Sequence, residues 1–185
     1  MKILVSCDEY CYKVGNDYFL RDFGHTLVNR YLMSFDSIRL AVRTKIVNST
    51  AELGKFNIKV VDPRIEIWPI KFSQGPKEFV IKFFPIKRNL KGICDGFDFA
   101  ILRLPSVSAF MVYEQINKHY IPFACELVFD CLDAVASAET VRDRYIWHEM
   151  HKQMTNACSQ SLGIAPVTKE YMQQHYSSMR SEAIY

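Results

Sequence analysis

Apolar residues in this chain occur in short runs that favour strands and in longer stretches with helical spacing. The clearest unit combines both kinds of segment. Residues 97–104 form a mostly apolar run that ends at Pro105, and Ser106 offers an N-cap for a helix predicted over 107–120. A second apolar run follows at 122–129. Two buried strands joined by a helix predict a parallel β-α-β unit.

The remaining segments repeat this alternation. Further strands are predicted at 2–7, 37–46, 57–61, 65–71 and 162–168, further helices at 23–35, 79–93, 141–161 and 169–178, a long loop or small hairpin at 9–22, and a loop at 131–140. Pro69 makes its strand an edge strand or an extended connection, and Pro85 is expected to start, kink or split its helix. The expected fold is α/β, with a Rossmann-like open, mostly parallel sheet and helices on both faces, in one domain over residues 1–185.

Composition narrows the class of protein. The chain has 185 residues, of which 49% are hydrophobic and 23% charged, as in ordinary soluble domains. A net charge of +3 without an arginine-rich run argues against a nucleic-acid partner. The six cysteines fall in or beside apolar segments and contain no CxxC pair, which favours reduced core residues over disulfides. No signal peptide or membrane span is visible, so we expect a cytoplasmic protein.

One segment is markedly basic. Lysine or arginine occurs at positions 71, 77, 82, 87, 88 and 91 against the single acid Glu78, an excess of five positive charges. A solvated helix face explains this pattern in ordinary terms. The alternative is a surface for an anionic partner, either phospholipid headgroups or a phosphorylated acceptor.

Several motifs that would assign a chemistry are absent from the sequence. There is no GxGxxG, GxxxxGK[ST] or GxSxG, which argues against dinucleotide dehydrogenases, P-loop enzymes and α/β-hydrolases. His148 and His151 are three positions apart rather than the four of zincin-type ligands. We therefore expect neither a metal nor a cofactor.

The candidate site follows from position alone. In open α/β sheets, ligands bind outside the carboxyl ends of the strands. The polar residues predicted there are Asp8, Arg43, Arg103, Ser106, Glu126, Asp130 and Thr168. Arg103 and Glu126 interrupt apolar runs, and a charge in a buried strand needs a partner. They form either a structural ion pair between neighbouring strands or hydrogen bonds to a polyhydroxyl ligand.

The order of these segments resembles a known family. Residues 97–130, the following long helix and the stretch from Gly163 to Met172 resemble the N-terminal half of the group 1 glycosyltransferases of the two-domain GT-B type. One departure is that the Gly-Gly usual after the family's first strand is missing. The resemblance implies a transferase that moves a sugar from a nucleotide sugar to an acceptor with retention, as in carbohydrate biosynthesis.

The resemblance also implies which half is present. Family members resemble two such domains in tandem, and the second domain holds the nucleotide sugar. We therefore expect residues 1–185 to be the acceptor-side half, without the C-terminal donor-binding domain and inactive alone. Its implied acceptor-binding candidates are Arg103, Glu126, Asp130 and Thr168, with the catalytic residues unassigned.

The implied partners follow from this role. They are an acceptor glycan or lipid-linked sugar, a nucleotide sugar only together with a second domain, and an anionic membrane through residues 77–91 at the inner face. The competing hypothesis is a freestanding Rossmann-like or flavodoxin-like binding or assembly module without catalytic activity.

Overall fold

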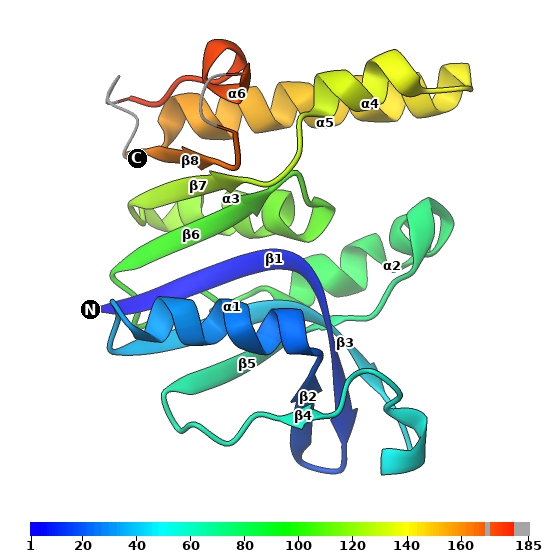
Figure 1. The fold of residues 1–185 in the computed structure, drawn as a ribbon, viewed down its shortest axis with the longest axis vertical. Coiled ribbons are helices and arrows are strands. Elements are labelled where there is room, and N and C mark those ends of the chain that lie inside the picture. The colour runs from blue at the N-terminus through cyan, green and yellow to red at the C-terminus, as the bar shows by residue number, and fades with distance from the viewer. Residues whose placement is uncertain (169–170, 180–185) are drawn as a thin grey trace.

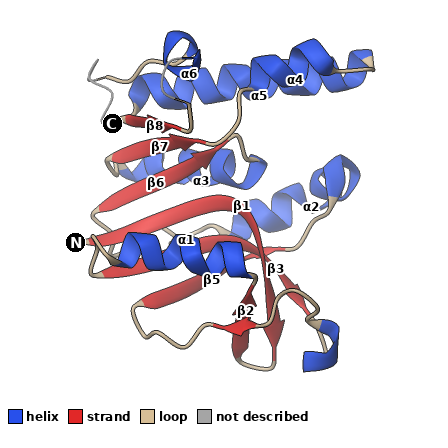
Figure 2. Cartoon of the chain, viewed as in Figure 1, coloured by secondary structure: helices blue, strands red, loops and turns tan. Residues whose placement is uncertain are grey.

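The computed structural model describes residues 1–168 and 171–179, whose strands form one eight-stranded sheet (Figures 1 and 2). Six of these strands are mutually parallel, in the order β5-β3-β1-β6-β7-β8. Their bounds are β1 Lys2–Val14, β3 Ser37–Ile46, β5 Ile65–Lys71, β6 Phe99–Leu104, β7 Phe123–Leu127 and β8 Ile164–Pro166. The expectation of an open, mostly parallel sheet is confirmed.

The strand order reverses at one point in the sheet. From β1 the chain steps outward to β3 and β5, then returns to the other side of β1 and continues through β6, β7 and β8. Numbered by parallel strands alone, this is 3-2-1-4-5-6, the Rossmann order. The reversal between β1 and β6 is the topological switch point, where open α/β sheets bind their ligands.

Helices cover both faces of the sheet, as the alternation along β1 requires. Ile3 and Val5 point into a core covered by α1, whereas Leu4 points into the larger core beneath the other helices. Figure 1 shows α1 in front of the sheet and α2 and α3 behind it. The helix bounds are α1 Asp22–Leu32, α2 Gly75–Asn89, α3 Val107–His119, α4 Cys131–Ser137, α5 Val141–Gln160, α6 Tyr171–His175 and the 3-10 helix η1 Thr50–Glu52.

The first strand is longer than its apolar run predicts. Instead of ending at residue 7, β1 bends and continues to Val14, where it turns into the antiparallel strand β2 (Asp17–Leu20). The short strand β4 (Ile58–Lys59) pairs with β2. The small hairpin expected within 9–22 is therefore present. It is an extension of the central strand, which makes it an arm of the sheet.

The other predictions from the sequence have mixed outcomes. Both β3 and β5 have the predicted bounds, and β5 is an edge strand paired only with β3 among the described residues. Pro85 lies inside α2, so it neither starts nor splits that helix. The loop predicted over 131–140 is wrong, because Asp130 caps a helix there. The terminal helix is confirmed only over 171–175, and residues 169–170 of that prediction lie outside the described part.

Candidate functional site

The carboxyl edge of the sheet around the switch point is the candidate functional site. Here β1 passes between the ends of β3 and β6, and its pairing changes register between Ser6 and Tyr10. Three residues of β1, from Cys7 to Glu9, lie opposite the single residue Val42 of β3. Such a bulge re-aims side chains and interrupts the ladder. Consecutive polar side chains of β1 are thereby presented at the edge.

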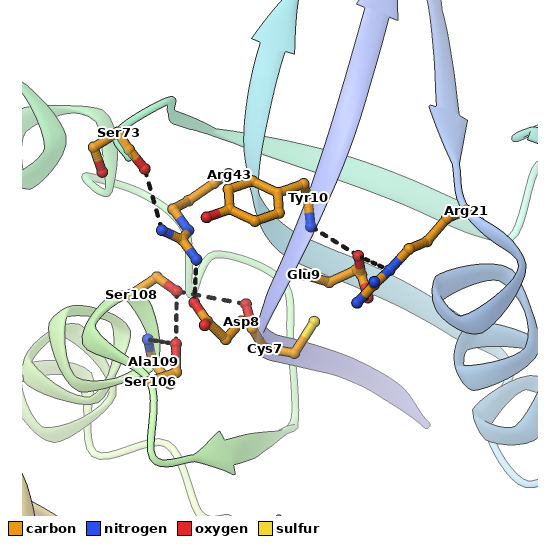
Figure 3. A network of polar contacts seen from close by, with 10 residues as sticks. All are labelled: Cys7, Asp8, Glu9, Tyr10, Arg21, Arg43, Ser73, Ser106, Ser108 and Ala109. Atoms are coloured by element: carbon orange, nitrogen blue, oxygen red, sulfur yellow. Dashed lines mark hydrogen bonds and ion pairs between the residues drawn. The ribbon is translucent and has the colours of Figure 1, made fainter. Parts of the chain in front are cut away.

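The N-terminus of α3 closes the bulge from one side (Figure 3). The Ser108 hydroxyl donates to the Cys7 carbonyl at 3.4 Å and lies 2.9 Å from the Ser106 hydroxyl. Ser106 in turn accepts from the backbone N–H of Ala109 at 3.3 Å and caps the helix, as predicted. Because the bulge removes strand partners, these serines satisfy polar groups that would otherwise be buried unpaired.

Asp8 and Arg43, predicted separately, form an ion pair across the bulge (Figure 3). The Arg43 guanidinium also donates to the Ser73 carbonyl at 3.1 Å and lies 4.3 Å from the centre of the Tyr10 ring. Its side chain is 16% exposed, whereas that of Asp8 is 58% exposed. Arg43 is thus mostly buried and links β3 to the neighbouring segments. Asp8 is the member of the pair that a ligand can reach.

Glu9 is the most enclosed carboxylate of the edge, at 2% exposure. It accepts from Arg21 at 2.7 Å and from the backbone N–H of Tyr10 at 3.1 Å. It also lies against the first turn of α1, since a Cβ added to Gly24 would come within 3.2 Å of Glu9 Cγ. The first helix of a Rossmann sheet normally receives a phosphate at this point. In this chain a carboxylate occupies that place.

Arg103 and Glu126 face each other in register on β6 and β7. Arg103 Nε lies 3.3 Å from Glu126 Oε2, and Arg30 Nη2 of α1 contacts the two carboxylate oxygens at 2.8 and 3.0 Å. Two arginines thus share one carboxylate. The Arg103 guanidinium lies 5.5 Å from the centre of the Phe23 ring, and its buried Nη1 has no hydrogen-bond partner among the described residues.

Asp130 and Thr168 belong to a neighbouring set of contacts. The buried Asp130 carboxylate accepts from the Leu132 N–H at 2.9 Å and the Tyr176 hydroxyl at 2.8 Å, and it contacts His175 Nδ1 at 2.8 Å. Burial acts to raise the pKa of Asp130, but the hydrogen bonds outweigh it and hold that pKa below its usual value. Thr168 accepts from the backbone N–H of Met172. Both residues organise the start of a helix here.

Sequence reasoning therefore found most of the charged groups at this edge, including the Arg103–Glu126 pair, and missed three further groups. It did not find Glu9, Arg21 or Arg30, whose contacts depend on the bend in β1 and on the placement of α1. Of these contacts, only the approach of Glu9 to α1 has a sequence signal, which is the glycine at position 24. Within the described residues no cluster of three or more histidine, cysteine or acidic residues has metal-binding geometry. None of the helices described is long and apolar enough to cross a membrane.

The strand order, the reversal between β1 and β6 and the polar edge define a Rossmann-like α/β domain. Among curated proteins the chain is similar to Protein CapJ of Staphylococcus aureus, with 26% identity over 179 residues. This match covers 95% of the chain and 44% of that protein, so the chain spans less than half of its relative. No family model matches. A solved structure of a UGT transferase from Siraitia grosvenorii in complex with UDP has a TM-score of 0.49 and 10% identity, over 95% of the chain and 46% of that structure.

Proposed function

We propose that this chain is the acceptor-side domain of a GT-B-type glycosyltransferase that transfers a sugar with retention of configuration. Three independent features support this proposal. The first is the Rossmann strand order with a polar carboxyl edge. The second is the resemblance of residues 97–130 and 163–172 to that family. The third is similarity to a protein more than twice as long as the matched region, which leaves room for a second domain.

The observation that carries the proposal is the position of Glu9. A nucleotide-binding Rossmann domain leaves the first helix N-terminus free to receive a phosphate. Here the buried Glu9 carboxylate, paired with Arg21, occupies the space beside the first turn of α1. The Glu9 side chain fills the space beside this turn, and the guanidinium of Arg21 is already committed to it, so neither the room nor the cation is free for a phosphate. This domain is therefore suited to an acceptor rather than to the nucleotide diphosphate of a donor.

Arg103 and Glu126 are the side chains that we propose to contact the acceptor. Sugar hydroxyl groups both donate and accept hydrogen bonds, so a guanidinium beside a carboxylate complements them. The Arg103 and Glu126 side chains are 13% and 20% exposed, so both remain partly accessible at the edge. Holding the acceptor hydroxyl in the reactive orientation lowers the barrier without any chemistry by the protein. Asp130 and, more weakly, Thr168, which follow the ends of β7 and β8, are proposed as further contacts.

The donor contacts would come from a second domain. In this scheme positive groups and a helix N-terminus of that domain stabilise the departing diphosphate, and the present chain supplies the facing surface. The chain alone would then bind an acceptor glycan or lipid-linked sugar without turning over. We place it in the cytoplasm, peripheral to an anionic membrane that residues 77–91 contact, where a lipid-linked acceptor would be presented.

Ligand-dependent melting tests whether this domain binds the acceptor and not the nucleotide sugar. A ligand that binds only the folded state raises the melting temperature. Purified chain should be stabilised by members of a panel of short oligosaccharides and unaffected by UDP-, GDP- and dTDP-sugars. Arg103→Ala should abolish the oligosaccharide shift. Arg142→Ala, which removes an exposed arginine on α5, is the matched control and should retain it.

Two results would contradict the proposal. Stabilisation by a nucleotide sugar would place the donor site in this domain. Sugar transfer by the purified chain without any second protein would show that the half is complete. If no sugar ligand shifts the melting temperature, the competing hypothesis of a freestanding binding or assembly module replaces the transferase.

A further inference from the structure

One side of α2 exposes large apolar side chains that the fold does not use. Val80, Ile81 and Phe84 are 72%, 78% and 79% exposed. The opposite side of the same helix is committed to the core, where Ile86 is 2% exposed and Phe83 packs against the main cluster. A soluble helix normally carries polar residues on its outer side. The outer side of α2 is apolar, which marks an interaction surface.

These side chains lie on one continuous stripe. At 100° per residue, positions 80, 81 and 84 fall within about a third of a turn of the helix. Arg88, one turn after Phe84, falls in the same stripe and is exposed. The stripe therefore has an apolar centre and a positive end, a combination that peripheral membrane helices use.

The charge around the stripe has one sign. Arg88 and Lys91 are exposed and form no ion pair within the described part of the chain, and the same holds for Lys71 at the end of β5. Lys82 and Lys87, in contrast, are paired with Glu78 and Glu114. The uncompensated charge near the apolar centre is therefore positive. Its complement is an anionic surface.

The stripe is also placed beside the candidate site. Gly75, the first residue of α2, closely follows Ser73, whose carbonyl accepts from Arg43 at the switch point. Figure 1 shows α2 on the carboxyl side of the parallel strands, to the right of the view. A surface that engaged the stripe would lie next to the edge that carries Asp8 and Arg103.

We propose that α2 is a membrane-docking helix, with Val80, Ile81 and Phe84 inserted among the acyl chains of an anionic monolayer and Arg88 at the headgroups. This inference rests on the proposed function in one respect, because docking would bring a lipid-linked acceptor to the site edge. Lipid fits better than a protein partner. Three exposed side chains fall far short of the roughly 20–30 residues that each side of a standard protein interface contributes.

Vesicle flotation of the 185-residue chain tests the proposal. The chain should float with phosphatidylcholine vesicles that contain phosphatidylglycerol, should float weakly with phosphatidylcholine alone, and should be released by high salt. Replacing the three apolar residues together by serine should weaken partitioning by about tenfold or more. Arg88→Gln should weaken it about fivefold, as expected for one basic side chain near an anionic surface.

Matched controls separate insertion from general stickiness. Val141→Ser and Met33→Ser remove side chains that are 83% and 85% exposed elsewhere, and both variants should float like the native chain. A dye on Phe84→Cys should shift to shorter wavelength when vesicles are added, since the native cysteines are buried and do not compete for labelling. A dye on Val141→Cys should not shift.

Three outcomes would overturn the proposal. The first is that the native chain does not float with anionic vesicles. The second is that the triple serine variant floats as well as the native chain. The third is that the triple serine variant loses self-association in gel filtration while the native chain does not bind vesicles. The last result would assign the stripe to a second copy of the chain. Melting shifts by soluble oligosaccharides should be unchanged in the triple variant, so loss of docking and loss of acceptor binding are read separately.

Discussion

Arg103 and Glu126 occupy equivalent positions on neighbouring parallel strands, so their side chains emerge from the same face of the sheet at its carboxyl edge. Their nearest charged atoms are 3.3 Å apart, and Arg30 approaches the same carboxylate from α1. Among the described residues, Glu126 is the carboxylate that contacts both Arg103 and Arg30. The ion pair expected from the sequence exists, and its location at the strand ends leaves it within reach of a ligand.

Removing the shared carboxylate should destabilise the protein. Glu126→Gln keeps the shape of the side chain but leaves Arg103 and Arg30 facing each other without compensation. Because the carboxylate is only partly buried, we expect a loss of about 1–2 kcal/mol in the free energy of unfolding. Urea denaturation measures this change. Glu149→Gln, which breaks an exposed pair on α5, should leave the urea midpoint unchanged, and an equal midpoint for both variants would contradict the argument.

Close approach, rather than a special backbone conformation, accounts for glycine at position 24. Gly24→Ala should not give the stabilisation of about 1 kcal/mol that alanine normally provides over glycine inside a helix, because the new Cβ would lie 3.2 Å from Glu9 Cγ. The stabilisation should appear in a Glu9→Ala background, where that neighbour is gone. A double-mutant cycle by chemical denaturation gives the coupling directly. Additive effects would mean that Glu9 does not lie against this turn.

The Asp130 carboxylate should contribute to acid sensitivity. Its pKa is lower in the folded chain than in the unfolded chain, so its stabilisation is fully present above the unfolded value of about 4. It is lost as the pH falls through the lower folded value. Asp130→Asn should therefore be less stable than the native chain at pH 7, by about 1 kcal/mol, and should converge with it toward pH 3. A constant difference across unfolding curves from pH 7 to 3 would refute this linkage.

The buried thiols should be unreactive until the chain unfolds. All six cysteines are free and buried, and burial raises the pKa of Cys7 and Cys131 to about 12. The nucleophilic thiolate is therefore scarce at pH 8. Ellman's reagent should react slowly with native protein and rapidly with all six thiols in guanidinium. Ser34→Cys adds an exposed thiol and should give one fast equivalent, whereas rapid native labelling without it would show that the core opens readily.

Most of the sheet was predictable from the sequence because its signal is local. The apolar runs at 37–46 and 65–71 gave both strands their bounds, and Ser106 was a recognisable helix cap. The helix α4 was missed because its small residues were interpreted as a loop, although alanine and leucine favour helices and Asp130 is a typical N-cap. It forms because Asp130 caps it and Cys131 and Ala134 are buried against the body of the fold. The cap was visible in the sequence, whereas the burial of Cys131 and Ala134 depends on the tertiary fold.

The candidate site was predictable only in part, for a related reason. Strand-end logic brought Asp8 near Arg43 and Arg103 near Glu126, because parallel strands carry their carboxyl ends to one edge. The contacts of Glu9 with Arg21 required knowledge that β1 bends without ending. A turn motif marks a chain reversal in the sequence, whereas a bulge inside a continuous strand has no comparable signature.

The continuous β1 strand also determines which parts of the molecule can close over a ligand. In most Rossmann sheets the first strand ends in a loop, and that loop can move. Here the backbone stays paired with β3 through Lys13 and Ile46, and the hairpin with β2 stiffens it further. This arm is a fixed wall of the site. Any gate over a ligand at this edge would therefore have to be formed by another part of the protein that moves against this wall.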